Sequence, residues 1–135
     1  MDVPKSSWNV TDDINISLEQ SSYPIGTTEF TAVLENHGGS VMLYGEGWRV
    51  EKYEDGAWQE LETIENSAFV AIGYHLLPGE TKKLVISTWF LAKPLETGRY
   101  RITGVALRTA ESMDELFHDG DYTEHPAYQL EFDIL

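Results

Sequence analysis

The chain has 135 residues, 41% of them hydrophobic and 12% aromatic, which suits one folded domain and is too apolar for a disordered segment. Its 23 acidic residues outnumber 9 basic ones, and the net charge of -14 disfavours binding to nucleic acid or to anionic lipid surfaces. The absence of cysteine excludes disulfides, thiolate zinc sites and cysteine nucleophiles, and no run approaches the roughly 20 apolar residues that span a bilayer.

Residues 1–13 are polar and show no sustained period, which predicts an N-terminal tether followed by a domain over 14–135. Seven later segments carry the alternating or β-rich pattern of short strands. In chain order they are 14–19, 29–35, 48–53, 57–61, 83–90, 100–107 and 128–134.

Turn signals separate these segments. Asp55-Gly56 lies between two of them and predicts a hairpin, while Leu77-Pro78-Gly79-Glu80 predicts a turn in which Gly adopts a positive φ. Residues 69–72 fit either a short edge strand or a packed loop. Ser112 and Glu115 match a capping box, which predicts one short helix over 111–117 in the last connection. The pattern therefore predicts an all-β antiparallel sandwich of about seven strands, with a barrel as the alternative.

Several segments also match the turns and strands of a known family. They are Tyr23-Pro24-x-Gly26, Leu34-Glu35-Asn36, Tyr44-Gly45, Val50-Glu51-Lys52 with Asp55-Gly56-x-Trp58, Leu77-Pro78-Gly79, and Gly98-Arg99-Tyr100-Arg101-Ile102. Together they resemble a bacterial immunoglobulin-like domain family of extracytoplasmic proteins, often lipoproteins, of Gram-positive bacteria. The resemblance covers about residues 14–107 and implies an immunoglobulin-like sandwich but no chemistry. Gly98-x-Tyr100 would suit the tyrosine corner of such folds.

The segment from His118 to His125 packs two imidazoles and three carboxylates into one Gly-containing loop. Alternate oxygen ligands in such a loop can converge on a hard cation, so Asp119, Asp121 and Glu124 are candidate Ca²⁺ ligands. Zinc would require a turn that brings the two histidines together. The alternative is a solvated acidic surface loop without a ligand.

The four tryptophans, Trp8, Trp48, Trp58 and Trp89, are the second candidate set, because exposed aromatic rings can stack on sugars. Trp48 is in phase with Val50, which places it in the core. Trp89 has the opposite phase to its apolar neighbours, which places it on an outer face with Val85. The alternative is that these rings fill the core or cover sheet edges.

The chain contains no nucleophile elbow, phosphate-binding Gly-rich loop or His-Glu-x-x-His pair. We therefore expect no enzymatic activity and no cofactor. The expected function is a non-catalytic, extracytoplasmic structural or protein-interaction module, with an unidentified protein partner and an anchor supplied by a removed lipoprotein signal. The alternative is a ligand-binding module for carbohydrate or a divalent cation.

Overall fold

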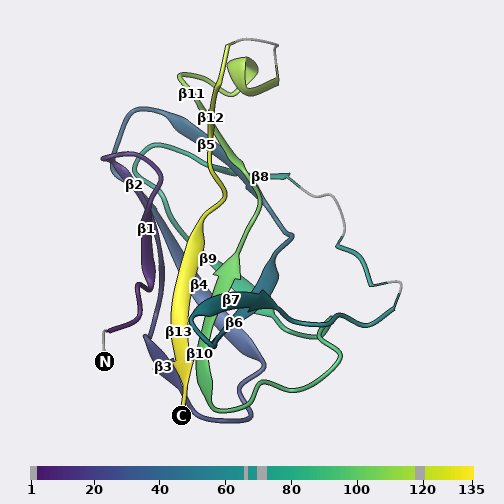
Figure 1. Ribbon diagram of the computed structural model, residues 1–135. Coiled ribbons are helices and arrows are strands. Elements are labelled where there is room, and N and C mark those ends of the chain that lie inside the picture. Colours follow the sequence, from purple (N-terminus) through teal and green to yellow (C-terminus); the bar gives the residue numbers. More distant parts are fainter. Residues whose placement is uncertain (1–2, 66, 70–72, 118–120) are drawn as a thin grey trace.

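The computed structural model of the chain describes residues 3–65, 67–69, 73–117 and 121–135, and most of its regular structure is β-strand (Figure 1). The described strands are β1 (Ser7–Asn9), β2 (Ile14–Leu18), β3 (Ser22–Tyr23), β4 (Glu29–Asn36), β5 (Val41–Gly45), β6 (Arg49–Glu54), β7 (Ala57–Glu60), β8 (Gly73–Leu76), β9 (Thr81–Ser87), β10 (Gly98–Thr103), β11 (Leu107–Ala110), β12 (Thr123–His125) and β13 (Gln129–Ile134). A 3-10 turn, η1 (Asp114–Phe117), joins β11 to the last strands.

The first layer is one antiparallel sheet in the order β1-β2-β4-β9. Its register places Ile16 opposite Leu34 and Ala32 opposite Leu84, and all four side chains are buried. The intervening residues point to the opposite face, as the two-residue period of a strand requires. The layer therefore has one apolar face, turned toward the core, and β9 forms one of its edges.

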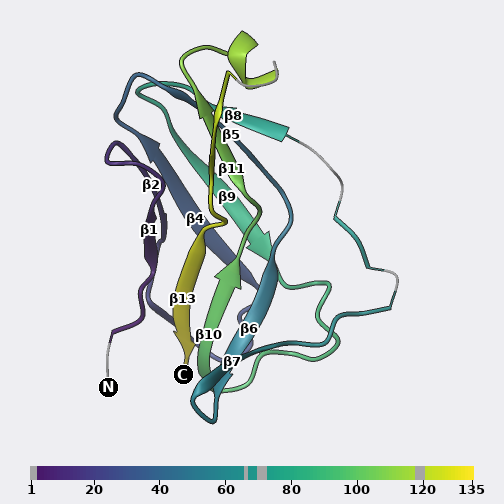
Figure 2. The ribbon, with the colours of Figure 1, turned by 45° about the horizontal axis from the view of Figure 1, so that its top comes forward.

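The second layer consists of two sheets, ordered β3-β13-β10-β6-β7 and β12-β11-β5-β8. Three segments run through both sheets, because β5 is followed by β6, β10 by β11 and β12 by β13 (Figures 1 and 2). The short β3 is parallel to β13, and the other pairs in this layer are antiparallel.

Each of the three segments is interrupted at the same level of the layer. Gly47 adopts a φ of 132° between β5 and β6, and Pro126 lies between β12 and β13. Gly104, between β10 and β11, lies so close to the Tyr128 ring that a Cβ atom there would be 2.1 Å from two ring carbons. Two glycines and one proline thus mark the level where one sheet ends and the next begins. Glycine allows a positive φ or a close contact, and proline lacks the N–H donor that a sheet needs.

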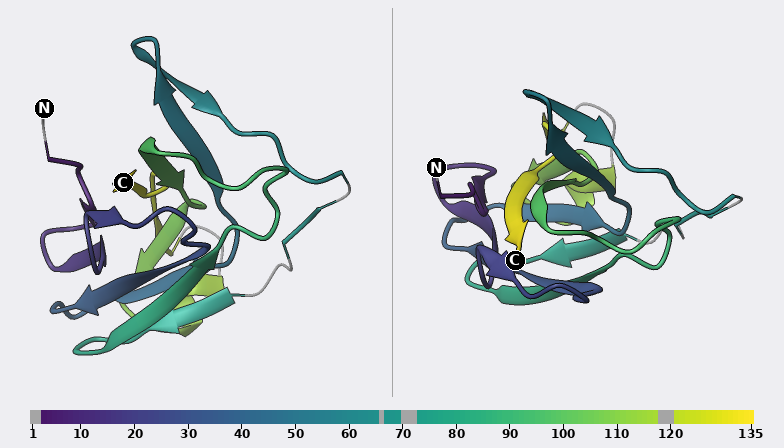
Figure 3. Two further views of the ribbon diagram at one scale, coloured as in Figure 1. Left: turned by 90° about the horizontal axis from the view of Figure 1, so that it is seen from below. Right: turned by 60° about the horizontal axis from the view of Figure 1, so that its bottom comes forward.

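The core lies between the two layers, which Figure 3 shows from the end of the molecule. Phe30 from the first layer contacts Phe132 from the second, with ring centroids 4.5 Å apart. Tyr100 also stacks on Phe132, with ring centroids 5.6 Å apart. Burial of such large apolar rings is the main stabilising contribution in a domain that has no disulfide.

The architecture confirms the predicted all-β sandwich, and the Asp55-Gly56 hairpin is present with φ of 54° and 80° at the two turn residues. The predicted turn before β9 is also present, because Glu80 N donates to Leu77 O at 3.0 Å and Gly79 has a φ of 82°. The predicted helix is a 3-10 turn, shorter than the range 111–117, and Glu115 N donates to Ser112 Oγ at its start.

The predicted N-terminal tether differs from what the structure shows. β1 pairs with β2, with Trp8 opposite Ile16, and the indole packs against the core. Just before β1, Lys5 O accepts from Glu131 N of β13 and Ser6 O accepts from Leu18 N of β2, both at 2.9 Å. The backbone of this segment therefore contacts both layers. The sequence did not predict β1, because three residues are too few to produce an alternating pattern.

Candidate functional site

The described residues contain only part of the predicted Ca²⁺ site. Asp119 lies outside them, Asp121 is exposed, and the Glu124 carboxylate lies 3.7 Å from the Arg108 guanidinium across the β11–β12 pair. Among the described residues, no group of three or more His, Asp or Glu side chains could hold a metal ion. The Ca²⁺ site stays a prediction, and an ion there would have to compete with Arg108 for Glu124.

Only one of the two histidines considered as zinc ligands lies within the described residues. His118 lies outside them, and a ring nitrogen of His125 is 2.7 Å from Thr109 Oγ1 on β11. The imidazole of His125 is therefore already used in a contact between β11 and β12.

The tryptophans occupy different environments, and those of Trp48 and Trp89 are the ones that their strand phases predict. Trp48 is 7% exposed, and its Nε1 donates to Ser87 O at 3.1 Å, which confirms its place in the core. Trp58 is half-buried on β7, where it lies over the Arg101 guanidinium at 4.5 Å. Trp89 is 52% exposed, and Val85 is 51% exposed, which confirms that both face outward.

A largely buried ion pair lies on the second layer, and no signal in the sequence indicated it. Glu51 on β6 accepts from Arg101 Nε at 3.1 Å and from Arg101 Nη2 at 2.8 Å, and also from Thr103 Oγ1 at 2.9 Å. The hydrogen bonds from Arg101 are the main reason that the pKa of Glu51 is lowered, with Thr103 adding to the effect and burial opposing it. The partners are 50 residues apart, so only the pairing of β6 with β10 reveals them.

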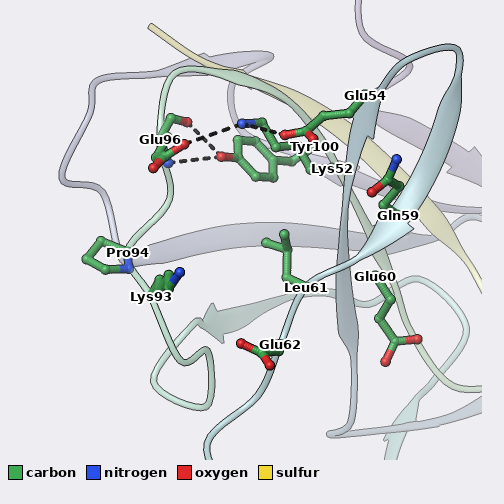
Figure 4. Close-up of a pocket in the computed structure, with 10 residues that line it drawn as sticks. All are labelled: Lys52, Glu54, Gln59, Glu60, Leu61, Glu62, Lys93, Pro94, Glu96 and Tyr100. Atoms are coloured by element: carbon green, nitrogen blue, oxygen red, sulfur yellow. Dashed lines mark hydrogen bonds and ion pairs between the residues drawn. The ribbon is translucent and has the colours of Figure 1, made fainter.

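A cleft of about 310 Å³ lies between the β6–β7 hairpin and the segment before β10 (Figure 4). Lys52 Nζ lies 3.0 Å from a Glu54 oxygen and 3.6 Å from a Glu96 oxygen. The Tyr100 hydroxyl donates to Glu96 O at 2.8 Å and accepts from Glu96 N at 2.9 Å. This geometry confirms the predicted tyrosine corner, and burial is the main cause of the raised pKa of Tyr100.

A second region, which we call the β9 groove, runs along the open edge of β9. It consists of two adjoining clefts, of about 320 Å³ and 180 Å³, that share Glu46 and Val85. The residues that we use to define it are Tyr44, Glu46, Trp48, Phe69, Tyr74, Val85 and Trp89.

The β9 groove combines aromatic walls with one carboxylate. Tyr44 and Tyr74 stack with centroids 5.5 Å apart, and Phe69 contacts the rings of Trp48 and Trp89 at 4.8 Å and 6.0 Å. The walls lie largely in segments that the sequence left open or gave no signal for, which is why only the exposure of Trp89 and Val85 was predicted. Concave aromatic surfaces with a few polar groups are typical of recognition sites.

A larger cleft, of about 660 Å³, lies beside the ends of β10 and β13. Its charged wall is the pair of Arg99 and Asp133, whose Nε and Oδ1 are 2.9 Å apart. We therefore take the β9 groove, with its exposed rings, as the candidate functional site.

In the part of the chain that the structure describes, no helix has the length and apolar character needed to cross a bilayer. A search of curated protein sequences finds no match. Among solved structures, the chain is similar to the ASH / PapD-like domain of human CEP192 (PapD-like domain 7), with 20% identity, 89% of this chain and 84% of that chain covered, and a TM-score of 0.43. A family model described as a bacterial Ig-like domain matches residues 9–116, well over half of the sequence. This chain therefore belongs to the bacterial Ig-like domain family.

Proposed function

We propose that this domain is a non-catalytic interaction module of an extracytoplasmic bacterial protein and that the β9 groove is its recognition surface. The observation that carries the proposal is the exposure of Val85 and Trp89, at 51% and 52%, on and beside an edge strand. Soluble sheet proteins usually protect their edges with charged side chains, so apolar groups retained at such a place favour contact with another molecule.

Two arginine–carboxylate pairs on the second layer support a non-catalytic role. Arg101 forms two hydrogen bonds with Glu51, and Arg99 pairs with Asp133. A carboxylate held by a guanidinium is a weak base and would have to lose its partner before it could transfer a proton. We also propose an extracytoplasmic location and a lipoprotein anchor, which the family resemblance supports, and fractionation of the bacterial cell would test both.

Site-specific photocrosslinking in the native host tests the recognition surface. A photoreactive amino acid at Val85 should give a discrete crosslinked product, whereas the same group at Ile25, which is 62% exposed away from the groove, should not. Trp89→Ala should remove the product at Val85. Equal products from Val85 and Ile25, or no product from Val85, would contradict the proposal.

The half-exposed ring of Trp89 also supports a second candidate, binding of a carbohydrate. Its face could stack on a sugar ring, with the nearby Glu46 carboxylate accepting hydrogen bonds from hydroxyl groups. A glycan array should then give signals that are lost in Trp89→Ala. An array without signals would count against this candidate and leave the protein-interaction role as the better one.

A further inference from the structure

The backbone of β9 has one side without a partner strand in the described structure. At the two ends of the β4–β9 pair, Asn36 N donates to Glu80 O at 3.0 Å and Thr88 N donates to Thr28 O at 2.9 Å. Hydrogen-bonded pairs alternate with non-bonded pairs in an antiparallel ladder. The even-numbered residues of β9 therefore bond to β4, and the N–H and C=O groups of Lys83 and Val85 point away from it.

A side chain occupies one end of this free edge, at Ser87, and a side-chain contact to β8 lies near the other end. Lys82 Nζ donates to His75 O on β8 at 2.8 Å, and Trp48 Nε1 donates to Ser87 O at 3.1 Å. Between these two contacts lie Lys83 and Val85, which offer two donors and two acceptors to one added strand. The free backbone groups thus adjoin the β9 groove, because Lys83 and Val85 both line the larger of its two clefts.

Pairing with β9 also fixes the direction in which the side chains of such a strand point. In an antiparallel pair, residues directly opposite each other point to the same face. A residue opposite Val85 would point outward beside Val85, whereas a residue opposite the buried Leu84 would point inward, toward Tyr44, Glu46 and Trp48.

The Glu46 carboxylate favours a positive charge on the inward side chain of the added strand. No ion pair of Glu46 is found among the described residues, while Lys83 is 3.2 Å from Glu19 and Lys82 is 3.7 Å from Glu80. A Lys or Arg could pass its aliphatic stem along the aromatic wall and place its head at the Glu46 carboxylate. The net charge of -14 favours a basic partner and disfavours a second copy of this chain.

We propose that the β9 groove binds an extended segment of a basic partner protein as an added antiparallel strand. The segment hydrogen-bonds to Lys83 and Val85, directs a Lys or Arg to Glu46, and places an apolar side chain beside Val85. This inference rests on the proposed recognition surface and adds to it the chemistry of the partner.

Random peptides displayed on phage are the probe. Peptides selected on the wild-type domain should share a basic residue that alternates with β-branched or aromatic residues. For a synthesised peptide, amide hydrogen exchange followed by NMR should show new protection at Lys83 and Val85. N-methylation of the peptide at the two bonding positions should weaken binding by on the order of tenfold or more, and N-methylation at the intervening positions should not.

Glu46→Gln tests the charge, with Glu111→Gln as the matched control at an exposed carboxylate outside the groove. Glu46→Gln should weaken the basic peptide by on the order of tenfold, and the control should not. Circular dichroism of both variants checks that they remain folded. Equal affinity of the two variants would overturn the basic-partner assignment.

Different results would overturn strand addition alone and the recognition surface as a whole. Peptides that lose binding in Trp89→Ala but ignore N-methylation, and leave Lys83 and Val85 unprotected, would overturn strand addition and keep the recognition surface. Selection without any binder, or with binders indifferent to Trp89→Ala, would overturn both. A dimer in sedimentation that Val85→Lys abolishes would identify a second copy as the occupant and contradict the basic partner.

Discussion

Two buried tyrosines differ in what their hydroxyl groups contact. The Tyr100 hydroxyl makes two hydrogen bonds with the backbone of Glu96, whereas the Tyr128 hydroxyl has no hydrogen-bond partner among the described residues. Burial raises the pKa of both phenols, so both stay protonated over the ordinary pH range. The Tyr100 hydroxyl therefore contributes to closing a loop, while that of Tyr128 carries a desolvation cost.

We expect Tyr100→Phe to lower the free energy of unfolding by about 1–2 kcal/mol, because it removes two hydrogen bonds and leaves a backbone donor unpaired. Tyr128→Phe should leave the stability unchanged or raise it slightly, since no hydrogen bond is lost. Urea denaturation of both variants measures the difference, and each is the control for the other. A larger loss in Tyr128→Phe than in Tyr100→Phe would contradict this interpretation.

The lowered pKa of Glu51 makes the ion pair with Arg101 dependent on pH. Its ordinary value is 4.5, and the folded value is below that, so the pair's stabilisation is fully present above about pH 4.5. It is lost as the pH falls through the folded pKa, because the protonated carboxyl no longer attracts the guanidinium.

Glu51→Gln should lower the free energy of unfolding near neutral pH by about 2 kcal/mol and make it less sensitive to acid below about pH 4.5. Urea denaturation as a function of pH measures both effects. The double variant with Arg101→Met is the control: it leaves no unpaired buried guanidinium and should be more stable than Glu51→Gln at neutral pH. A variant with the same acid sensitivity as the wild type would show that other carboxyl groups cause it.

At the scale of the elements, the sequence pattern predicted the strands from β2 to β13 that lie in its seven segments, but it predicted no strand at β1, β3, β5, β8 or β12 and no interruption within a segment. The run 100–107 reads as one strand, yet β10 ends at Thr103, next to Gly104, where the Tyr128 ring, 24 positions further along the chain, occupies the space that a side chain would need. Local pattern cannot contain such a contact. The strand phase of Trp89 is a local property, and it predicted the exposure of that ring. The position of Glu46 in a groove beside β9 depends on long-range contacts, and nothing local to Glu46 indicated it.

Gly104→Ala should destabilise the domain by about 1–3 kcal/mol or more, because the added methyl group must displace the buried ring of Tyr128. Gly39→Ala is the matched control, since a Cβ atom at Gly39 would have no neighbour within 4 Å. Thermal unfolding followed by circular dichroism compares the two variants. Equal melting temperatures would mean that the Tyr128 ring can move away at little cost.

At the scale of the whole molecule, the net charge of -14 opposes folding through repulsion between carboxylates. Several ion pairs counter this repulsion, but some of them join exposed side chains, such as Lys83 with Glu19 and Arg108 with Glu124. Exposed pairs of this kind contribute roughly 0–1 kcal/mol each. The long-range repulsion should therefore outweigh the loss of those pairs when salt screens both.

We accordingly expect the melting temperature to rise as sodium chloride is increased from about 0.01 M to about 0.15 M, where the Debye length falls from about 30 Å to about 8 Å. Differential scanning calorimetry measures the shift, and a variant in which several exposed carboxylates are replaced by glutamine should show a smaller one. The more buried Glu51–Arg101 pair is screened less and should persist. A melting temperature that falls with salt would mean that the exposed ion pairs, and not the net charge, dominate the electrostatic free energy of this domain.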